Sequence, residues 1–199
     1  MSALTALEIE KLLPATFTAP GLSEAEFLEL CAKFPEDMVE YWADGTVIIM
    51  PPTNSRSAKL VAQVVAQLVN WASTHGGYAF GSDAGFRFRD GSLFAPDASW
   101  CQEARWDEAM KSAATFPVLA PEFVIEVRSL SDPLWRLRNK METYIANGVQ
   151  LAWLIDPIER TVTIYRPGQP EQTLTSPASV EGEGPVAGFV LNLERVFGE

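Results

Sequence analysis

Residues 121–157, PEFVIEVRSLSDPLWRLRNKMETYIANGVQLAWLIDP, decide the fold because they encode a strand, a helix and a second strand in succession. The runs PEFVIEVRS and VQLAWLIDP are short and mostly apolar, which is typical of buried strands. Between them, Ser131 or Asp132 is placed to cap a helix. Pro133 suits the first turn of that helix, and Gly148 ends it. Two strands joined through a helix predict a right-handed crossover unit.

Hairpins and further helices surround this unit. VEYWADGTVIIMPP predicts a hairpin with an Asp-Gly turn, and RTVTIYRPG predicts a strand that returns through an Asp-Pro pair. NSRSAKLVAQVVAQLVNWASTHGG repeats apolar residues at helical spacing, and LSEAEFLEL begins an earlier helix. Residues 78–100 predict three short strands, and a last strand is expected at about 188–193. Together these elements predict an α/β fold, a mixed β-sheet flanked by helices, with an N-terminal helix and β-hairpin.

Length and composition predict one globular domain. The chain has 199 residues, 47% of them hydrophobic, and six Trp, which indicates a substantial core. Residues 1–20 are rich in Ala, Thr and Pro, so we expect an N-terminal arm there and a single domain over residues 21–199.

Several features of the sequence limit where the protein is expected to act and which chemistry it could perform. No apolar run reaches the ~20 residues of a membrane helix, and the N-terminus lacks a signal-peptide pattern, so we expect no membrane association. Cys31 and Cys101 stand far apart and predict a reduced, cytoplasmic protein. The single histidine, His75, makes a Ser-His-Asp triad hard to build. The net charge of −11 disfavours casual nucleic-acid binding, although residues 53–140 are nearly neutral.

The strand PEFVIEVRS contains two charges in an apolar setting. Because side chains alternate along a strand, Val124, Glu126 and Arg128 are expected on one face. A carboxylate buried there costs several kcal/mol unless a partner or a metal compensates it. One interpretation is therefore a structural Glu126–Arg128 ion pair, and the other is a metal ligand.

A second carboxylate favours the metal interpretation. Asp97, in FAPDASW, follows Pro96 and precedes apolar residues, which by itself is ordinary turn chemistry. Combined with Glu126 on a strand, Asp97 becomes a candidate partner in a clamp for Mg²⁺, which prefers one or two carboxylates together with water and phosphate.

Two further charged residues are candidates for the same site. Lys140 lies on the helix after Glu126, with Arg136 and Thr143 on roughly the same face, and it could approach the carboxylates. Glu40, in the first hairpin, is a third candidate acid. A solvated helix face for Lys140 and an ordinary edge-strand charge for Glu40 are the simpler interpretations.

The stretches VEYWADGTVIIMPP, APDASW, PEFVIEVRSLSD, KMETYIANGVQLAWLIDP and TVTIYRPG, in this order, resemble the Uma-two family of restriction endonuclease-like proteins within the PD-(D/E)XK nuclease superfamily. The resemblance implies a restriction endonuclease-like fold and a site that hydrolyses DNA phosphodiester bonds with Mg²⁺, or with Mn²⁺ in its place. It implies that Asp97 and Glu126 are metal ligands and that Glu40 is an auxiliary acid.

The sequence departs from the superfamily pattern at the lysine, because the E-x-K lysine falls on Arg128. Arginine stays protonated and cannot act as a base, but it can hold a phosphate. Lys140 is therefore the second candidate for the lysine role. A further departure is Arg56, where relatives often have histidine.

Three interpretations thus remain open at the level of the sequence. The first is a Mg²⁺-dependent DNA endonuclease, expected to be a homodimer because a duplex has two strands to cleave. The second is a catalytically inactive binding or regulatory module that retains the nuclease fold. The third is an unrelated α/β enzyme, in which Asp97 and Glu126 would lie far apart.

Overall fold

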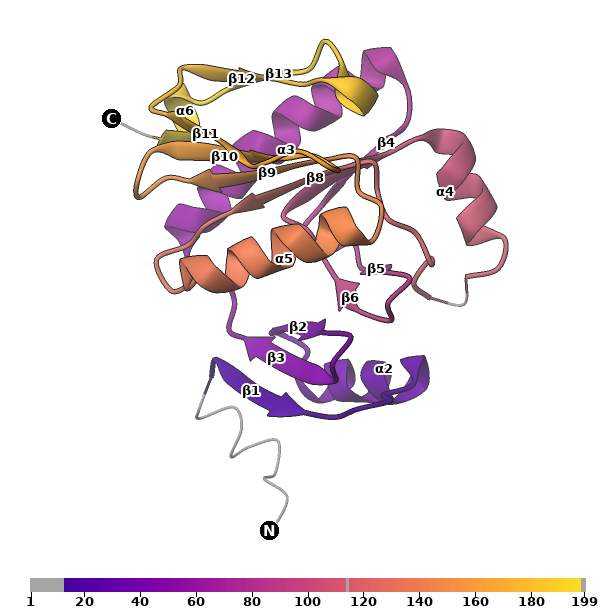
Figure 1. Cartoon of the computed structure of the whole chain (residues 1–199). Helices are drawn as coiled ribbons and strands as arrows, with labels where there is room; N and C mark the ends of the chain where they lie inside the picture. The colour runs from indigo at the N-terminus through magenta and orange to yellow at the C-terminus, as the bar shows by residue number, and fades with distance from the viewer. Residues whose placement is uncertain (1–12, 114, 198–199) are drawn as a thin grey trace.

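The computed structural model describes residues 13–113 and 115–197. A six-stranded sheet forms its centre, in the order β11-β10-β9-β8-β7-β4, with β8 and β9 parallel to each other (Figure 1). Its strands are β4 (Tyr78–Gly81), β7 (Ala98–Cys101), β8 (Phe123–Val127), β9 (Leu151–Asp156), β10 (Thr161–Tyr165) and β11 (Gln172–Thr175).

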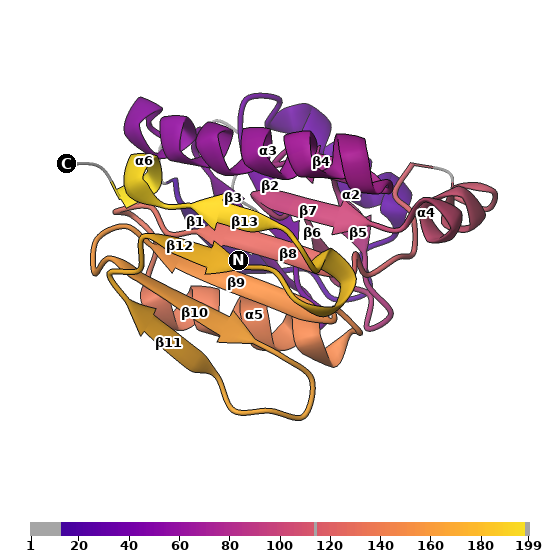
Figure 2. The same cartoon turned by 90° about the horizontal axis from the view of Figure 1, so that it is seen from above.

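Helices cover both faces of this sheet (Figure 2). One face carries α3 (Ser55–His75), the ribbon of β12 (Ser179–Glu181) and β13 (Val190–Asn192), the 3₁₀ turn η1 (Gly184–Val186) and α6 (Glu194–Phe197). The other face carries α5 (Leu134–Ala146), and α4 (Glu103–Met110) follows β7 at the end of the molecule opposite the first turn of α5.

The alternation of side chains along β8 separates two hydrophobic cores. Phe123 and Ile125 face the core under α3, whereas Val124 faces the core under α5. In the first core, Trp153 packs edge-on against Phe123 and stacks on Phe189. Since Glu126 shares the face of Val124, the same alternation turns its carboxylate toward α5.

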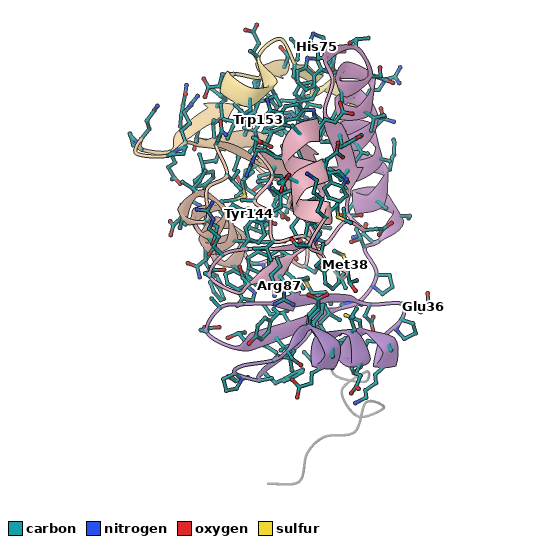
Figure 3. The ribbon with its side chains drawn as sticks, turned by 90° about the vertical axis from the view of Figure 1, so that its right-hand side faces the viewer. Glu36, Met38, His75, Arg87, Tyr144 and Trp153 are labelled. Atoms are coloured by element: carbon teal, nitrogen blue, oxygen red, sulfur yellow. The ribbon has the colours of Figure 1, made fainter. Side chains whose placement is uncertain are left out.

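A second sheet lies below the first (Figure 1), and its Glu40 and Phe94 contact Lys140 and Tyr144 of α5. It has the order β1-β3-β2-β6-β5 and packs on α2 (Glu24–Lys33). Its strands are β1 (Ala15–Thr18), β2 (Met38–Tyr41), β3 (Thr46–Met50), β5 (Phe86–Arg87) and β6 (Leu93–Phe94). In Figure 3, Tyr144 lies between Trp153 of the upper core and the lower sheet with Met38 and Arg87. Tyr144 contacts Phe88 and Phe94 edge-on or tilted, which joins the two sheets.

The sequence predicted the main elements correctly. The crossover unit is present, with β8 paired in parallel to β9 and α5 between them. The Asp-Gly hairpin forms as β2 and β3, and its turn needs glycine, because Gly45 has φ +86° and a β-carbon added there would lie 2.7 Å from the α-carbon of Pro20. The predicted α/β class with a mixed sheet is confirmed.

Other details differ from the predictions. Residues 78–100 form four strands instead of three, because the chain leaves the central sheet after β4, adds β5 and β6 to the lower sheet and returns as β7. The short strands β11, which is mostly exposed, and β12, which buries only Val180, were not predicted. Of the predicted arm, residues 1–12 lie outside the described part, but Ala15–Thr18 pairs with β3 and is a sheet edge. The described helices include none that is long and apolar enough to cross a bilayer.

Candidate active site

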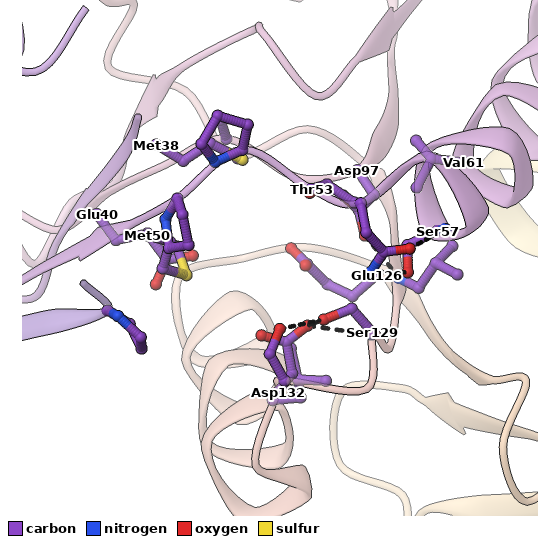
Figure 4. A pocket seen from close by; sticks show the side chains of 18 of the residues that line it. Met38, Glu40, Met50, Thr53, Ser57, Val61, Asp97, Glu126, Ser129 and Asp132 are labelled. Atoms are coloured by element: carbon purple, nitrogen blue, oxygen red, sulfur yellow. Dashed lines mark hydrogen bonds between the residues drawn. The ribbon is translucent and has the colours of Figure 1, made fainter. Parts of the chain in front are cut away.

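A pocket of about 230 Å³ opens between the two sheets, at the carboxyl end of β8 (Figure 4). The first turns of α3 and α5 flank it, and the β2–β3 hairpin closes a third side. Three of the predicted acids and the predicted lysine line it together: Glu40, Asp97, Glu126 and Lys140. The structure thus brings Asp97 and Glu126 to one pocket, whereas the third interpretation expected them to lie far apart.

Lys140 is the centre of a buried ion-pair network. Its Nζ lies 2.9 Å from Oε1 of Glu126 and 2.6 Å from Oε1 of Glu40. The Tyr144 hydroxyl donates a 2.7 Å hydrogen bond to the same Oε1 of Glu126. Lys140, Glu126 and Glu40 are each exposed by 5% or less, so the network is held inside the protein. The simpler interpretations, a solvated lysine and an edge-strand glutamate, are wrong.

Asp97 is held against the last residue of β8. Its Oδ2 accepts a 2.7 Å hydrogen bond from the backbone N–H of Val127, the residue after Glu126. This bond fixes the Asp97 carboxylate beside the strand that carries Glu126. The two carboxylates therefore approach the pocket from neighbouring strands, since Asp97 directly precedes β7 and β7 pairs with β8.

Burial controls the protonation of these carboxylates. It raises the pKa of Glu126 to about 7, against the attraction of Lys140. It also raises the pKa of Asp97 to about 6, against the hydrogen bond from Val127. For Lys140, burial favours the neutral amine, but Glu126 and Glu40 outweigh it and raise the pKa of the ammonium. Lys140 thus stays charged. For Glu126 and Asp97, the attraction of this one ammonium does not offset the cost of burying a negative charge, so their pKa values remain raised.

Arg128 lies apart from this network. Its guanidinium makes a 2.7 Å ion pair with Asp156 at the end of β9 and donates to the carbonyl of Asp132. The interpretation as a Glu126–Arg128 pair is therefore wrong, because strand β8 ends at Val127 and each charge has found another partner. Arg128 is not among the described residues that line the pocket, and its catalytic role stays a prediction.

The loop between β8 and α5 forms part of the pocket wall. Asp132 accepts hydrogen bonds from the backbone N–H and the hydroxyl of Ser129, and it pairs with Arg136 at 3.2 Å. The expectation that Ser131 or Asp132 caps α5 is wrong, since Pro133 holds the cap position and no side chain bonds there. The Asp132 carboxylate instead braces the loop, whose residues Ser129 and Ser131 line the pocket.

The sequence profile of the Uma2 family, described as "Putative restriction endonuclease", matches residues 24–194. This chain belongs to the Uma2 family. A solved structure agrees with that assignment: "a putative nuclease belonging to DUF820" from Anabaena variabilis ATCC 29413 is 25% identical and superposes with a TM-score of 0.73. The match covers 87% of this chain and 96% of the other. A search of curated proteins found no match.

Membership of the Uma2 family confirms the restriction endonuclease-like fold and supports a nuclease. The pocket can be tested against the metal that this class of fold implies. Apart from the bonds from Lys140, Tyr144 and Val127, the described residues offer no hydrogen bond to the carboxylates of Glu126 and Asp97, so each keeps one oxygen for the pocket.

The carboxylate oxygens of Glu126 and Asp97 are the type of ligand that Mg²⁺ prefers. The ion takes one or two carboxylates and fills its remaining positions with water and phosphate oxygens. Within residues 13–113 and 115–197, no group of three or more His, Cys, Asp or Glu side chains is arranged to hold a metal. Asp97 and Glu126 are the residues that would hold the ion, and their role as metal ligands stays a prediction.

The raised pKa values predict how stability depends on pH. The ordinary pKa is 4.5 for Glu126 and 3.8 for Asp97, against about 7 and about 6 in the folded protein. Between about pH 4 and pH 7 the folded state holds more protons, so these groups lower the free energy of unfolding as pH rises. At ~1.4 kcal/mol per unit, the Glu126 contribution is on the order of 3 kcal/mol.

We expect Glu126→Gln to remove this part of the pH dependence. The measurement is urea unfolding in EDTA at pH 5 and pH 7.5, for wild type and variant. Wild type should lose more stability across that interval than Glu126→Gln. Equal losses in the two proteins would contradict the raised pKa.

Proposed function

We propose that this Uma2 protein is a Mg²⁺-dependent endonuclease that hydrolyses DNA phosphodiester bonds. The observation that carries the proposal is the meeting of Asp97, Glu126 and Lys140 in one pocket. Asp97 and Glu126 would hold the ion, and Mn²⁺ could replace it. When bound, the ion supplies Lewis-acid activation and lowers the pKa of a water ligand.

The protein's own residues have distinct parts in this proposal. Lys140 stays protonated, which suits it to stabilise negative charge developing on the phosphate and not to act as a base. Tyr144 fixes the orientation of the Glu126 carboxylate, and Glu40 holds the ammonium of Lys140 in place. Lys140 thereby fills the role of the lysine that the resemblance implied at Arg128.

The test is metal-dependent cleavage of a plasmid and of oligonucleotides. Wild type should cleave with Mg²⁺ or Mn²⁺ and stop in EDTA. Asp97→Asn should lower the rate by about 10²-fold, the order expected when an electrostatic group at the reacting centre is lost. Asp107→Asn, an exposed position on α4, should leave the rate unchanged. Cleavage that is independent of metal, or unaffected by Asp97→Asn, would refute the proposal.

Calorimetry separates the proposal from an inactive module with the same fold. Titration with Mn²⁺ should show binding that Asp97→Asn weakens. Metal binding without cleavage of any DNA would favour the inactive module. The expected homodimer and the cytoplasmic location stay predictions, and sedimentation analysis would measure the former.

A further inference from the structure

We infer that the pocket takes an unpaired nucleic-acid strand and that Trp135 and Leu130 pack against its bases at the pocket mouth. This inference names the substrate class of the proposed nuclease site and rests on that proposed function. Four features support it: the depth of the charged groups, the apolar rim, the exposed residues on the adjoining loop and helix, and the charge of the chain.

The groups that would meet the phosphate lie deep. Glu126, Glu40 and Lys140 are about 95% buried, at the bottom of a pocket of about 230 Å³. Duplex DNA is stiff over ~150 bp, so bending it sharply to bring a phosphate into so small a space costs free energy that an unpaired strand does not have to supply. Enzymes that must reach a recessed nucleotide act on single strands or extrude the nucleotide from the stack. An unpaired strand bends freely and can carry one phosphate to the bottom.

The rim of the pocket is apolar where the floor is charged. Met38 in β2 and Met50 in β3 line one side (Figure 4), and Pro51 and Pro52, which follow β3, also line the pocket. Duplex DNA presents phosphates and groove edges to a protein and keeps the faces of its bases stacked. An unpaired strand exposes those faces, so it alone offers apolar surface to this rim and phosphate to the floor.

Two large apolar side chains near this rim are exposed to solvent. Leu130, in the loop between β8 and α5, is 73% exposed, and Trp135, in the first turn of α5, is 70% exposed. Leu130 stands between Ser129 and Ser131, and Trp135 directly precedes Arg136; these three neighbours line the pocket, whereas Leu130 and Trp135 are not among the described residues that do. Aromatic side chains stack on any base and hold single strands without reading sequence.

The charge of the molecule agrees with stacking as a main source of affinity. A duplex-binding protein gathers Lys and Arg over a long surface, whereas this chain has a net charge of −11. Arg136 lines the pocket but pairs with Asp132, and Arg138, partly exposed on α5, lies 4.0 Å from Glu171. Because both arginines already have acidic partners, they would neutralise few phosphates, so binding should depend only weakly on salt.

The experiment measures binding of a fluorescein-labelled 20-nucleotide single strand and of the matching duplex by anisotropy, with Ca²⁺ in place of Mg²⁺. We expect the single strand to bind at least tenfold more tightly than the duplex. Trp135→Ala should weaken single-strand binding by about 10-fold, since stacking contributes ~1–3 kcal/mol per base. Trp135→Phe should restore most of it, and Leu130→Ala should weaken it less.

Val118→Ala is the matched control for Leu130→Ala. Val118 is 61% exposed, lies next to Arg87 in the lower sheet and is not among the described residues lining the pocket. This variant should bind like wild type. Equal affinity for duplex and single strand, or a neutral Trp135→Ala, would overturn the inference. So would a Trp135→Ala variant that changes only the oligomeric state, because the exposed residues would then form an interface between copies.

Cleavage assays separate this inference from the nuclease proposal. If metal-dependent cleavage occurs but duplex and single strand are cut equally, the nuclease stands and the inference fails. If no DNA is cut but single strands bind through Trp135, the nuclease proposal fails and the preference for an unpaired strand stands.

Discussion

Glu126→Gln is expected to lower metal-dependent cleavage by on the order of 10²–10³-fold, the loss seen when one preorganised electrostatic group is removed from a reacting centre. Glu126 is placed where the proposed ion and Lys140 meet, since its Oε1 accepts from Lys140 and Tyr144 while its other oxygen is left for the pocket. Glutamine keeps the size and the acceptor oxygen, so the fold should survive while the charge is lost. Initial rates of oligonucleotide cleavage at saturating Mg²⁺ measure the effect.

Glu122→Gln is the matched control for this variant. Glu122 is a second carboxylate that is 4% exposed, four positions earlier, but it pairs with Arg105 and accepts from the backbone N–H of Gln102. Its replacement should lower stability and leave the cleavage rate per folded molecule unchanged. A similar loss of cleavage in both variants would show that Glu126 acts through the fold and not through the chemistry.

Lys140→Met is expected to lower the free energy of unfolding by about 3–5 kcal/mol at pH 8, the cost of breaking a buried ion pair from one side. Methionine fills much of the space, but Glu126 and Glu40 are then left buried without their cation. The cost should shrink at pH 5, where Glu126 can take up a proton. Urea unfolding at the two pH values measures the difference.

The matching double variant tests the reason for that loss. Lys140→Met combined with Glu126→Gln should recover part of the stability at pH 8, because one uncompensated charge is gone. Lys59→Met, at an exposed position on α3, should change stability by less than about 0.5 kcal/mol. A double variant that loses the sum of both single effects would contradict the network.

Local patterns in the sequence were sufficient for the central elements of the fold. The apolar strands, the helix between them and the Asp-Gly turn each depend on neighbouring residues, and each formed as predicted. The division of residues 78–101 between two sheets depends on distant partners: Tyr41 pairs with Leu93, and Ala98 pairs with Ile125. Such pairings leave no periodic signal in a single sequence.

Local patterns also predicted part of the candidate site. Alternation along β8 indicated which way Glu126 points, and the helix after it brought Lys140 within reach. The partners were harder to foresee. Tyr144 lies four residues after Lys140, and its spacing placed it on the same helix face, yet its bond to Glu126 depends on the packing of α5. Asp132 stands at a position that is typical of a helix cap, so the sequence did not indicate that its carboxylate instead accepts hydrogen bonds from Ser129 in the loop.

The ion pair between Glu40 and Lys140 links segments that are far apart in the chain. Glu40 belongs to the lower sheet, whereas Lys140 belongs to the helix packed on the central one. During folding, contacts at long sequence separation carry the greater loop-closure cost and tend to form late. The charged pocket is therefore completed only when the two sheets dock, so recovery of its chemistry during refolding reports the last step of assembly.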